Sequence, residues 1–236
     1  MARIAIVIPI FGSVRPLRAC LASIARQTFR DVEIVVVDDG NVPPVELPTC
    51  TTAFPMRLLR QAHAGAPVAR NLGAGTTDSE LLLFCDADVV LDPHALARME
   101  AALREHPEAS YAYSAFRFGW KRFSSFPFDP QRLRSMPYIH TTALMRRAHF
   151  PGFDPTLSRF QDWDLWLTML AQGHTGAHIP ETLFRITSTR GTMSRWIPSF
   201  VYRLPWKSAR VRAYEDARDC IMQKHHLSPE RNVSNE

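Results

Sequence analysis

Cysteine is scarce in this sequence, and the few cysteines stand far apart. They are Cys20, Cys50, Cys85 and Cys220. No two of them form a Cys-x-x-Cys pair, so the sequence indicates neither a zinc site nor a disulfide framework. Scattered single thiols are typical of a reducing compartment, and we therefore expect a cytoplasmic protein.

Long apolar runs are also missing, and none is long enough to span a bilayer. The opening residues MARIAIVIPIF contain one basic residue and a short apolar run that Pro9 interrupts. A signal peptide needs a longer apolar region and a small-residue cleavage site. The opening therefore predicts a first β-strand.

A large excess of charge of one sign is missing too. The formal net charge is +5, which fits an anionic ligand or an anionic surface but is too small to indicate a nucleic-acid partner. No GxGxxG motif follows the first predicted strand, which argues against a dinucleotide-binding dehydrogenase. The missing Gly-rich phosphate loop likewise argues against a sugar nucleotidyltransferase.

What the sequence does contain is an apolar run that ends in two carboxylates. Residues 81–85 (LLLFC) show no polar alternation, which is typical of a strand buried on both faces of a parallel sheet. Asp86 and Asp88 follow, and residues at i and i+2 of an extended chain point to the same side. The two acids would meet beyond the carboxyl end of a central strand, where open α/β sheets bind ligands. Such a pair favours a hard divalent cation, Mg²⁺ or Mn²⁺.

The alternative is that one of these acids only caps the next helix. Asp92 and Pro93 already supply a cap and a first-turn proline for that helix. We therefore favour the ligand site.

Strands and helices alternate along most of the chain. The pattern predicts strands at residues 4–10, 32–37, 56–59, 81–85, 111–118 and 177–186, and helices at residues 16–27, 65–74, 94–106 and 158–172. Residues 119–137 are aromatic and proline-containing and predict a long loop that forms a binding surface. The order predicts a single α/β domain in which helices flank a mostly parallel central sheet.

A second acidic pair, Asp38 and Asp39, follows the strand at residues 32–37. Read alone, Asp39 and Gly40 form an ordinary turn signal, and a turn is as good an interpretation as a site. Two buried strands that deliver acids to one sheet edge predict a shared crevice. Arg70, on the helix at residues 65–74, would point toward that crevice, although a lone helical arginine is usually solvated.

The helix predicted from Ser158 carries acids in or near its first turn. Ser158 and Gln161 have the spacing of a capping box. Asp162 and Asp164 follow, and their simplest role is to offset the helix dipole. The same dipole would keep Asp162 ionised, which is the state that a general base needs.

Taken in order, these segments resemble glycosyltransferase family 2 enzymes with the GT-A fold. The matching segments, all within residues 3–194, are VIPIFGSVRPLRACLASIARQTF, EIVVVDDG, GAPVARNLGA, LLLFCDADVVLDPHAL, PGFDPTL and QDWDLWLTML. The resemblance implies a metal-dependent, inverting hexosyltransferase. We expect it to move a sugar from a nucleoside-diphosphate donor, UDP-linked, to a hydroxyl of a glycan or lipid-linked glycan in cell-surface polysaccharide synthesis.

The resemblance also implies how the donor is held. Pro9 and Phe11 would flank the nucleotide base, and Asp39 would form a hydrogen bond with it. Arg70 would help to hold the nucleotide, and Asp86 would reach its ribose side.

Two further roles concern the chemistry of transfer. Asp88 would ligate Mn²⁺ or Mg²⁺, which would act as a Lewis acid at the departing diphosphate. Asp162 would be the catalytic base that takes the acceptor proton.

Three positions depart from the family pattern. Gly12 stands where the family often has asparagine, and Gln161 where glutamate often precedes the base. Thr187 stands where a histidine commonly binds metal or diphosphate, so the third protein ligand is in doubt. These departures leave open an alternative function, a non-catalytic nucleotide-sugar-binding module that kept the fold.

Residues 195–236 predict a helical tail behind a glycosyltransferase domain at residues 1–194. No acidic residue lies between Thr182 and Tyr214, where aromatic and basic side chains alternate. Aromatic rings beside cations suit the headgroup region of an anionic membrane. A tail that covers the domain's own core is an equally good interpretation. Peripheral contact with the inner face of the membrane is the expectation.

Overall fold

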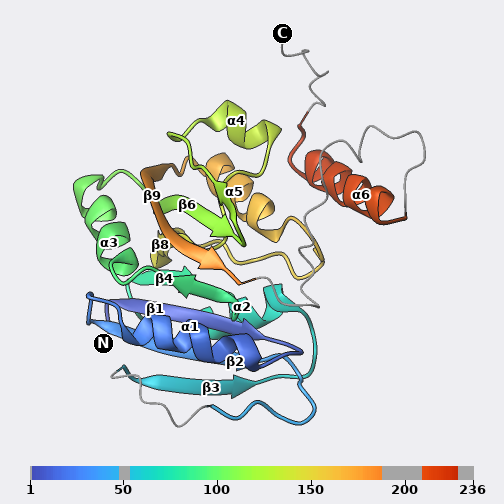
Figure 1. Ribbon diagram of the computed structural model, residues 1–236. Coiled ribbons are helices and arrows are strands. Elements are labelled where there is room, and N and C mark those ends of the chain that lie inside the picture. Colours follow the sequence, from blue (N-terminus) through green and yellow to red (C-terminus); the bar gives the residue numbers. More distant parts are fainter. Residues whose placement is uncertain (1, 48–53, 188–208, 228–236) are drawn as a thin grey trace.

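A curled, nine-stranded mixed sheet organises the chain (Figure 1). The computed structural model describes residues 2–47, 54–187 and 209–227. The strands are β1 (Ile4–Ile10), β2 (Val32–Asp38), β3 (Met56–Arg60), β4 (Leu81–Phe84), β5 (Val89–Leu91), β6 (Tyr111–Phe118), β7 (Lys121–Phe123), β8 (Leu144–Arg146) and β9 (Gly176–Ile186). The helices are α1 (Arg15–Ala25), α2 (Ala66–Gly75), α3 (Ala95–Glu105), α4 (Pro130–Ser135), α5 (Gln161–Ala171) and α6 (Ala209–Lys224). The sheet order is β3-β2-β1-β4-β8-β6-β9-β5, with β7 paired to β6.

The first half of the sheet is parallel, as its apolar runs predict. Strands β3, β2, β1 and β4 pair in parallel, and every residue of β1 and β4 is buried. Successive side chains enter opposite layers: Ile4 and Ile6 pack with α1 and α3, whereas Ala5 and Val7 pack with α2 and α5. Helices therefore cover both faces. The parallel pairing places the carboxyl ends of β1, β2 and β4 at one edge.

Pro9 sits inside β1, although proline is unusual in a central strand. Pairing between β1 and β4 ends at Val7 and Phe84, so the missing N–H of Pro9 falls beyond that ladder. The proline therefore marks the point at which β1 and β4 separate.

The second half of the sheet is mixed. Strand β8 is antiparallel to β4 and β6, β6 is parallel to β9, and β5 is antiparallel to β9. The expectation of one long loop at residues 119–137 is wrong, because this stretch contains β7 and α4. Asp129 caps α4 by accepting hydrogen bonds from the backbone N–H groups of Gln131 and Arg132.

Helix α6 packs beside α5 (Figure 1). Ile221 and Met222 are buried and join the apolar cluster that contains Trp163 and Trp166 of α5. The expected boundary near residue 194 and most of the basic and aromatic stretch fall outside the described residues. Among the helices in the described ranges, none has the length and apolarity to cross a membrane.

Candidate active site

The carboxyl ends of β1, β2 and β4 bring the expected site residues to one edge of the sheet. Phe11 follows β1, Asp39 follows β2, and Asp86 lies two residues after β4. Backbone hydrogen bonds fix these segments: the Asp39 N–H donates to Ile10 O, and the Cys85 N–H donates to Val7 O, each at 2.9 Å. These segments therefore form the sheet edge at which the two acidic strand ends predicted a crevice.

Asp38 holds the turn after β2 together. Its carboxylate accepts hydrogen bonds from Asn41 N (2.9 Å), Asn41 Nδ2 (2.7 Å) and Val45 N (3.1 Å). Burial opposes ionisation of Asp38, but these hydrogen bonds and Arg60 outweigh it and lower the pKa. Asn41 also accepts from Gly12 N at 2.7 Å, and Gly12 adopts a φ of 80°. A positive φ suits glycine, which has no side chain to clash with the backbone.

Asp39 is buried, and its carboxylate is already engaged within the chain. It accepts hydrogen bonds from the backbone N–H groups of Ala64 and Gly65 (both 2.9 Å) and from Gln61 Nε2 (2.7 Å). His63 Nδ1 lies 2.9 Å from its second oxygen. A base that binds Asp39 must replace one of the two side-chain contacts, so Gln61 and His63 belong to this part of the site.

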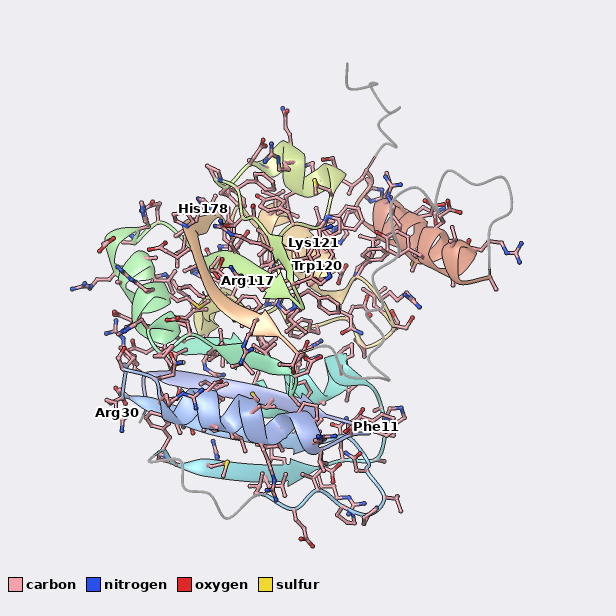
Figure 2. All side chains as sticks on the ribbon, viewed as in Figure 1. Phe11, Arg30, Arg117, Trp120, Lys121 and His178 are labelled. Carbon is pink, nitrogen blue, oxygen red and sulfur yellow. The ribbon has the colours of Figure 1, made fainter. Side chains whose placement is uncertain are left out.

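Phe11 is 57% exposed and stacks on His63, with the ring centroids 3.8 Å apart and the planes at 17°. It lies at the right-hand end of the lower strands, clear of the core (Figure 2). A flat, half-open pair of rings at the end of β1 suits a planar ligand. Sequence reasoning named Phe11 but missed His63.

Arg70 is buried and joins two parts of the site. Its Nη2 donates to Asp86 Oδ1 and its Nη1 donates to Gln161 Oε1, both at 2.7 Å. The guanidinium carbon lies 5.1 Å from the Phe153 ring centroid, which supports it from the side. The arginine therefore ties the end of β4 to the start of α5.

Asp86 and Asp88 differ in their electrostatics although they are two residues apart. Burial raises the pKa of Asp86, but Arg70 and His140 outweigh it, so the net shift is downward. Burial, and then the charge of Asp86, raises the pKa of Asp88 to about 6. Thr187 donates its N–H and its hydroxyl to the backbone carbonyl of Asp88, each at 2.9 Å. Thr187 thus fixes the Asp88 backbone. It occupies the position where the resemblance led us to expect a histidine.

Helix α5 begins without the expected capping box. Phe160 is the N-cap, in a left-handed conformation with φ 56°, and no side chain caps the helix. Gln161 instead donates to Leu157 O at 3.0 Å and accepts from Arg70. The capping-box prediction is wrong because the helix begins at Gln161, so Ser158 does not occupy the N-cap position.

Asp162 follows in the first turn of α5, and its Oδ1 accepts from Trp163 N at 2.9 Å. Burial raises the pKa of Asp162, and the opposing charges of His140 and Arg70 do not cancel that shift. Burial therefore outweighs the stabilisation of the ionised form that the helix start was expected to give. A carboxylate with a raised pKa takes up a proton more readily, which suits a general base.

Asp164 is buried, and its carboxylate binds side chains at the end of α6 and just beyond it. Lys224 Nζ lies 2.8 Å from its Oδ1, and His225 Nε2 lies 2.7 Å from the same oxygen. Lys224 also pairs with Asp154 at 2.6 Å. These bonds do more than offset a helix dipole, because they attach α6 to the helix that carries Asp162.

His140 was not singled out from the sequence. Its ring packs against both Phe116 and Phe184, at 5.0 and 5.1 Å between centroids, and its Nδ1 accepts from Thr142 N at 3.0 Å. Burial lowers the pKa of His140, while the charges of Asp86 and Asp162 oppose that shift. A single histidine in a loop gives no sequence signal for such a position.

A family comparison agrees with this geometry. Residues 5–161 match the family model of glycosyl transferase family 2. The chain therefore belongs to this family of glycosyltransferases.

Individual relatives include glycosyltransferases and an O-antigen biosynthesis protein. An uncharacterized glycosyltransferase, YibD, of Escherichia coli is 32% identical over 56% of this chain and 40% of its own length. The O-antigen biosynthesis protein RfbC of Myxococcus xanthus is 28% identical over 71% of this chain and 14% of its own. A PGL/p-HBAD biosynthesis glycosyltransferase of Mycobacterium bovis is 33% identical over 67% of this chain and 66% of its own. The chain thus spans less than half the length of the first two.

Solved structures show that the fold is GT-A. Staphylococcus aureus TarS in complex with UDP-GlcNAc matches with a TM-score of 0.64 and 16% identity, over 85% of this chain and 64% of that one. The mannosyltransferase PcManGT of Pyrobaculum calidifontis, in complex with GDP-Man and Mn²⁺, matches with a TM-score of 0.62 and 16% identity, over 95% and 63%.

Proposed function

We propose that this protein is an inverting glycosyltransferase that uses a UDP-linked sugar and a glycan or lipid-linked glycan acceptor. The observation that carries the proposal is the Arg70 bridge, which joins Asp86 to the turn that bears Asp162. A donor-side carboxylate and a base-side carboxylate are thereby held in one rigid unit. Such fixed positioning lowers the barrier to transfer.

In the proposed reaction, Pro9 and Phe11 flank the base, and Asp39 binds it together with Gln61 and His63. Asp86 accepts from the ribose, and Arg70 holds the Asp86 carboxylate. Asp162 takes the proton from the acceptor hydroxyl as the hydroxyl oxygen attacks the anomeric carbon. Attack from the face opposite the departing diphosphate gives inversion.

Asp88 is the residue proposed to hold a divalent cation. Its pKa is raised to about 6 by burial and by the charge of Asp86, and a nearby cation would relieve both effects. The described residues contain no cluster of three or more acidic, histidine or cysteine ligands. They fit a Mg²⁺ or Mn²⁺ ion that Asp88 binds and that takes its other oxygens from water and the donor diphosphate. When bound, the ion supplies positive charge to the leaving group.

The test is calorimetric titration of UDP in the presence and absence of Mn²⁺. We expect Mn²⁺-dependent binding that Asp88→Ala abolishes and that Asp31→Ala preserves. Asp31 is an exposed acid at the opposite end of β2 and serves as a charge-matched control. Equal UDP affinity with and without Mn²⁺ would contradict the metal assignment.

The alternative function is a nucleotide-sugar-binding module without turnover. The network that holds the first turn of α5 favours an enzyme, because a module that only binds the donor does not need a fixed base. Release of free sugar from a donor by the purified protein would distinguish the two functions.

A further inference from the structure

Three neighbouring strands, β7, β6 and β9, align aromatic side chains on one face. Phe116 lies opposite Phe123 on one side and Phe184 on the other. The rings stack with planes at 3°, at 4.9 Å and 5.2 Å between centroids. Phe116 and Phe184 also contact His140. This face of the three strands is therefore turned toward the active site.

The next row on the same strands consists of arginines. Arg117 lies opposite Arg122 on β7 and Arg185 on β9. Because neighbouring residues of a strand point to opposite faces, this row lies away from the phenylalanines. All three arginines are exposed, and the ion pairs found between described residues involve none of them. Arg122 donates to the carbonyl of Pro180 at 3.1 Å.

A row of like charges in cross-strand register costs folding free energy. An anionic ligand that binds several guanidinium groups offsets that cost, and arginine binds phosphate groups bidentately. Neighbouring strands lie about 4.8 Å apart, so the three guanidinium groups form one compact cationic patch. The arrangement points to an anionic surface as the ligand.

The hairpin that joins β6 to β7 ends in an exposed tryptophan. Gly119, with φ 58°, and Trp120 form its two-residue turn. Trp120 is 91% exposed, and residues 116–126 (FRFGWKRFSSF) contain no acid. Trp120, Lys121 and Arg117 lie together near the end of β6 (Figure 2).

The turn lies at the rim of the candidate active site. Gly119 N donates to Ile186 O at 3.4 Å, and the next residue, Thr187, binds the backbone of Asp88. A ligand seated on Trp120 and the arginine row would therefore lie beside the crevice without filling it.

We propose that Trp120 and the arginine row (Arg117, Arg122 and Arg185), together the hairpin surface, dock on an anionic phospholipid membrane. Tryptophan prefers the headgroup level of a bilayer, where its ring is apolar and its N–H meets water. The arginines bind lipid phosphates. The sequence led us to expect membrane contact from the basic and aromatic stretch after Thr182, which includes Arg185. The hairpin surface adds Arg117, Trp120 and Arg122 of the folded domain to that contact.

The test is co-sedimentation of the full chain with vesicles, without donor or acceptor, so the result does not depend on glycosyl transfer. Vesicles of phosphatidylcholine with about one third phosphatidylglycerol are compared with pure phosphatidylcholine, at low and high salt. We expect binding only to the anionic vesicles at low salt. The triple variant R117Q/R122Q/R185Q should lose about a hundredfold in partitioning, since each cation near such a surface is worth about fivefold. Trp120→Ala should also weaken binding.

Matched variants control for net charge and for folding. R18Q/R98Q/R104Q removes three exposed helical arginines and should bind like the original chain. The hairpin triple variant should melt at the same temperature or higher, because a like-charge row is removed.

Three outcomes would overturn the proposal. The first is equal binding by the two triple variants, and the second is no preference of the original chain for anionic vesicles. The third is unchanged vesicle binding together with a raised KM for a water-soluble phosphorylated acceptor. That third result would assign the arginine row to the acceptor.

Discussion

At the scale of single residues, Arg70 shows how a side chain gains its role from its partners. It is buried, and its guanidinium binds Asp86 and Gln161, which lie 16 and 91 residues away in sequence. Within this structure the positive charge acts on the carboxylates of Asp86 and Asp162. Any contact of Arg70 with a nucleotide would therefore come in addition to this positioning role.

Asp162→Asn tests the proposed base. The amide oxygen of asparagine can still accept the hydrogen bond from Trp163 N, so the turn should keep its shape. Loss of proton uptake should lower kcat by about a hundredfold or more, the usual scale of general base catalysis, while donor affinity stays unchanged. Steady-state kinetics and calorimetry measure the two quantities.

Near-normal turnover by Asp162→Asn would move the role to another group. Asp164 is a poor replacement, because Lys224 and His225 already bind its carboxylate.

At the scale of elements, α6 packs against the domain and contacts the start of α5. Lys224 pairs with Asp154 and Asp164, and Phe160, the N-cap of α5, contacts Tyr214 of α6 at 4.9 Å between ring centroids. The helix therefore supports the same turn that presents Asp162. An appended tail without such contacts would leave that turn free to move.

Lys224→Met should destabilise the protein by about 1 to 2 kcal/mol at neutral pH, because two carboxylates lose their cation. The estimate stays below the range for a fully buried pair because the Lys224 side chain is 37% exposed. Denaturant unfolding measures the difference. Arg212→Met, an exposed cation on the same helix, should change little.

The pH dependence of this difference follows from Asp154. Hydrogen bonds from Lys224 and Thr156 lower the pKa of Asp154 to about 2. Its contribution is therefore complete above its unfolded pKa, near 3.8, and is lost as the pH falls toward 2. The two proteins should converge in stability over that interval. A gap that stays constant down to pH 2 would contradict the ion pair.

At the scale of the whole molecule, the two halves of the sheet have different tasks. The parallel half carries Phe11, Asp39 and Asp86 at the edge where we propose that the donor binds, whereas the mixed half supplies the hairpin surface and the wall that holds His140. The Arg70 bridge and helix α5 connect the halves. A donor bound at this edge would therefore stabilise the whole domain.

A thermal-shift screen of nucleotide sugars with Mn²⁺ tests this coupling. It also tests the proposal that the donor carries a uracil base. A UDP-linked sugar at a hundredfold excess over its Kd should raise the melting temperature by about 5 to 10 °C. Chelation of the metal should remove the shift, as should Asp88→Ala. A larger shift with GDP-linked sugars would contradict the UDP assignment.

The sequence predicted the elements that have strong periodic patterns. Runs such as LLLF specify strands buried on both faces, and an acid placed directly after such a strand must emerge at the carboxyl edge. It did not predict β5, β7 and β8, because three residues are too few to show a period. The aromatic stretch after β6 was interpreted as loop for the same reason.

By itself, the sequence therefore determined the order of the longer strands and helices, the acidic edge of the sheet and the family. Only the tertiary structure decided what each side chain touches: Arg70 reaches Gln161, Lys224 reaches Asp164, and His140 comes near Asp86 and Asp162. The physical reason is that hydrophobic periodicity is a local property of the chain. Ion pairs and hydrogen bonds instead depend on distances that packing alone sets between segments far apart in sequence.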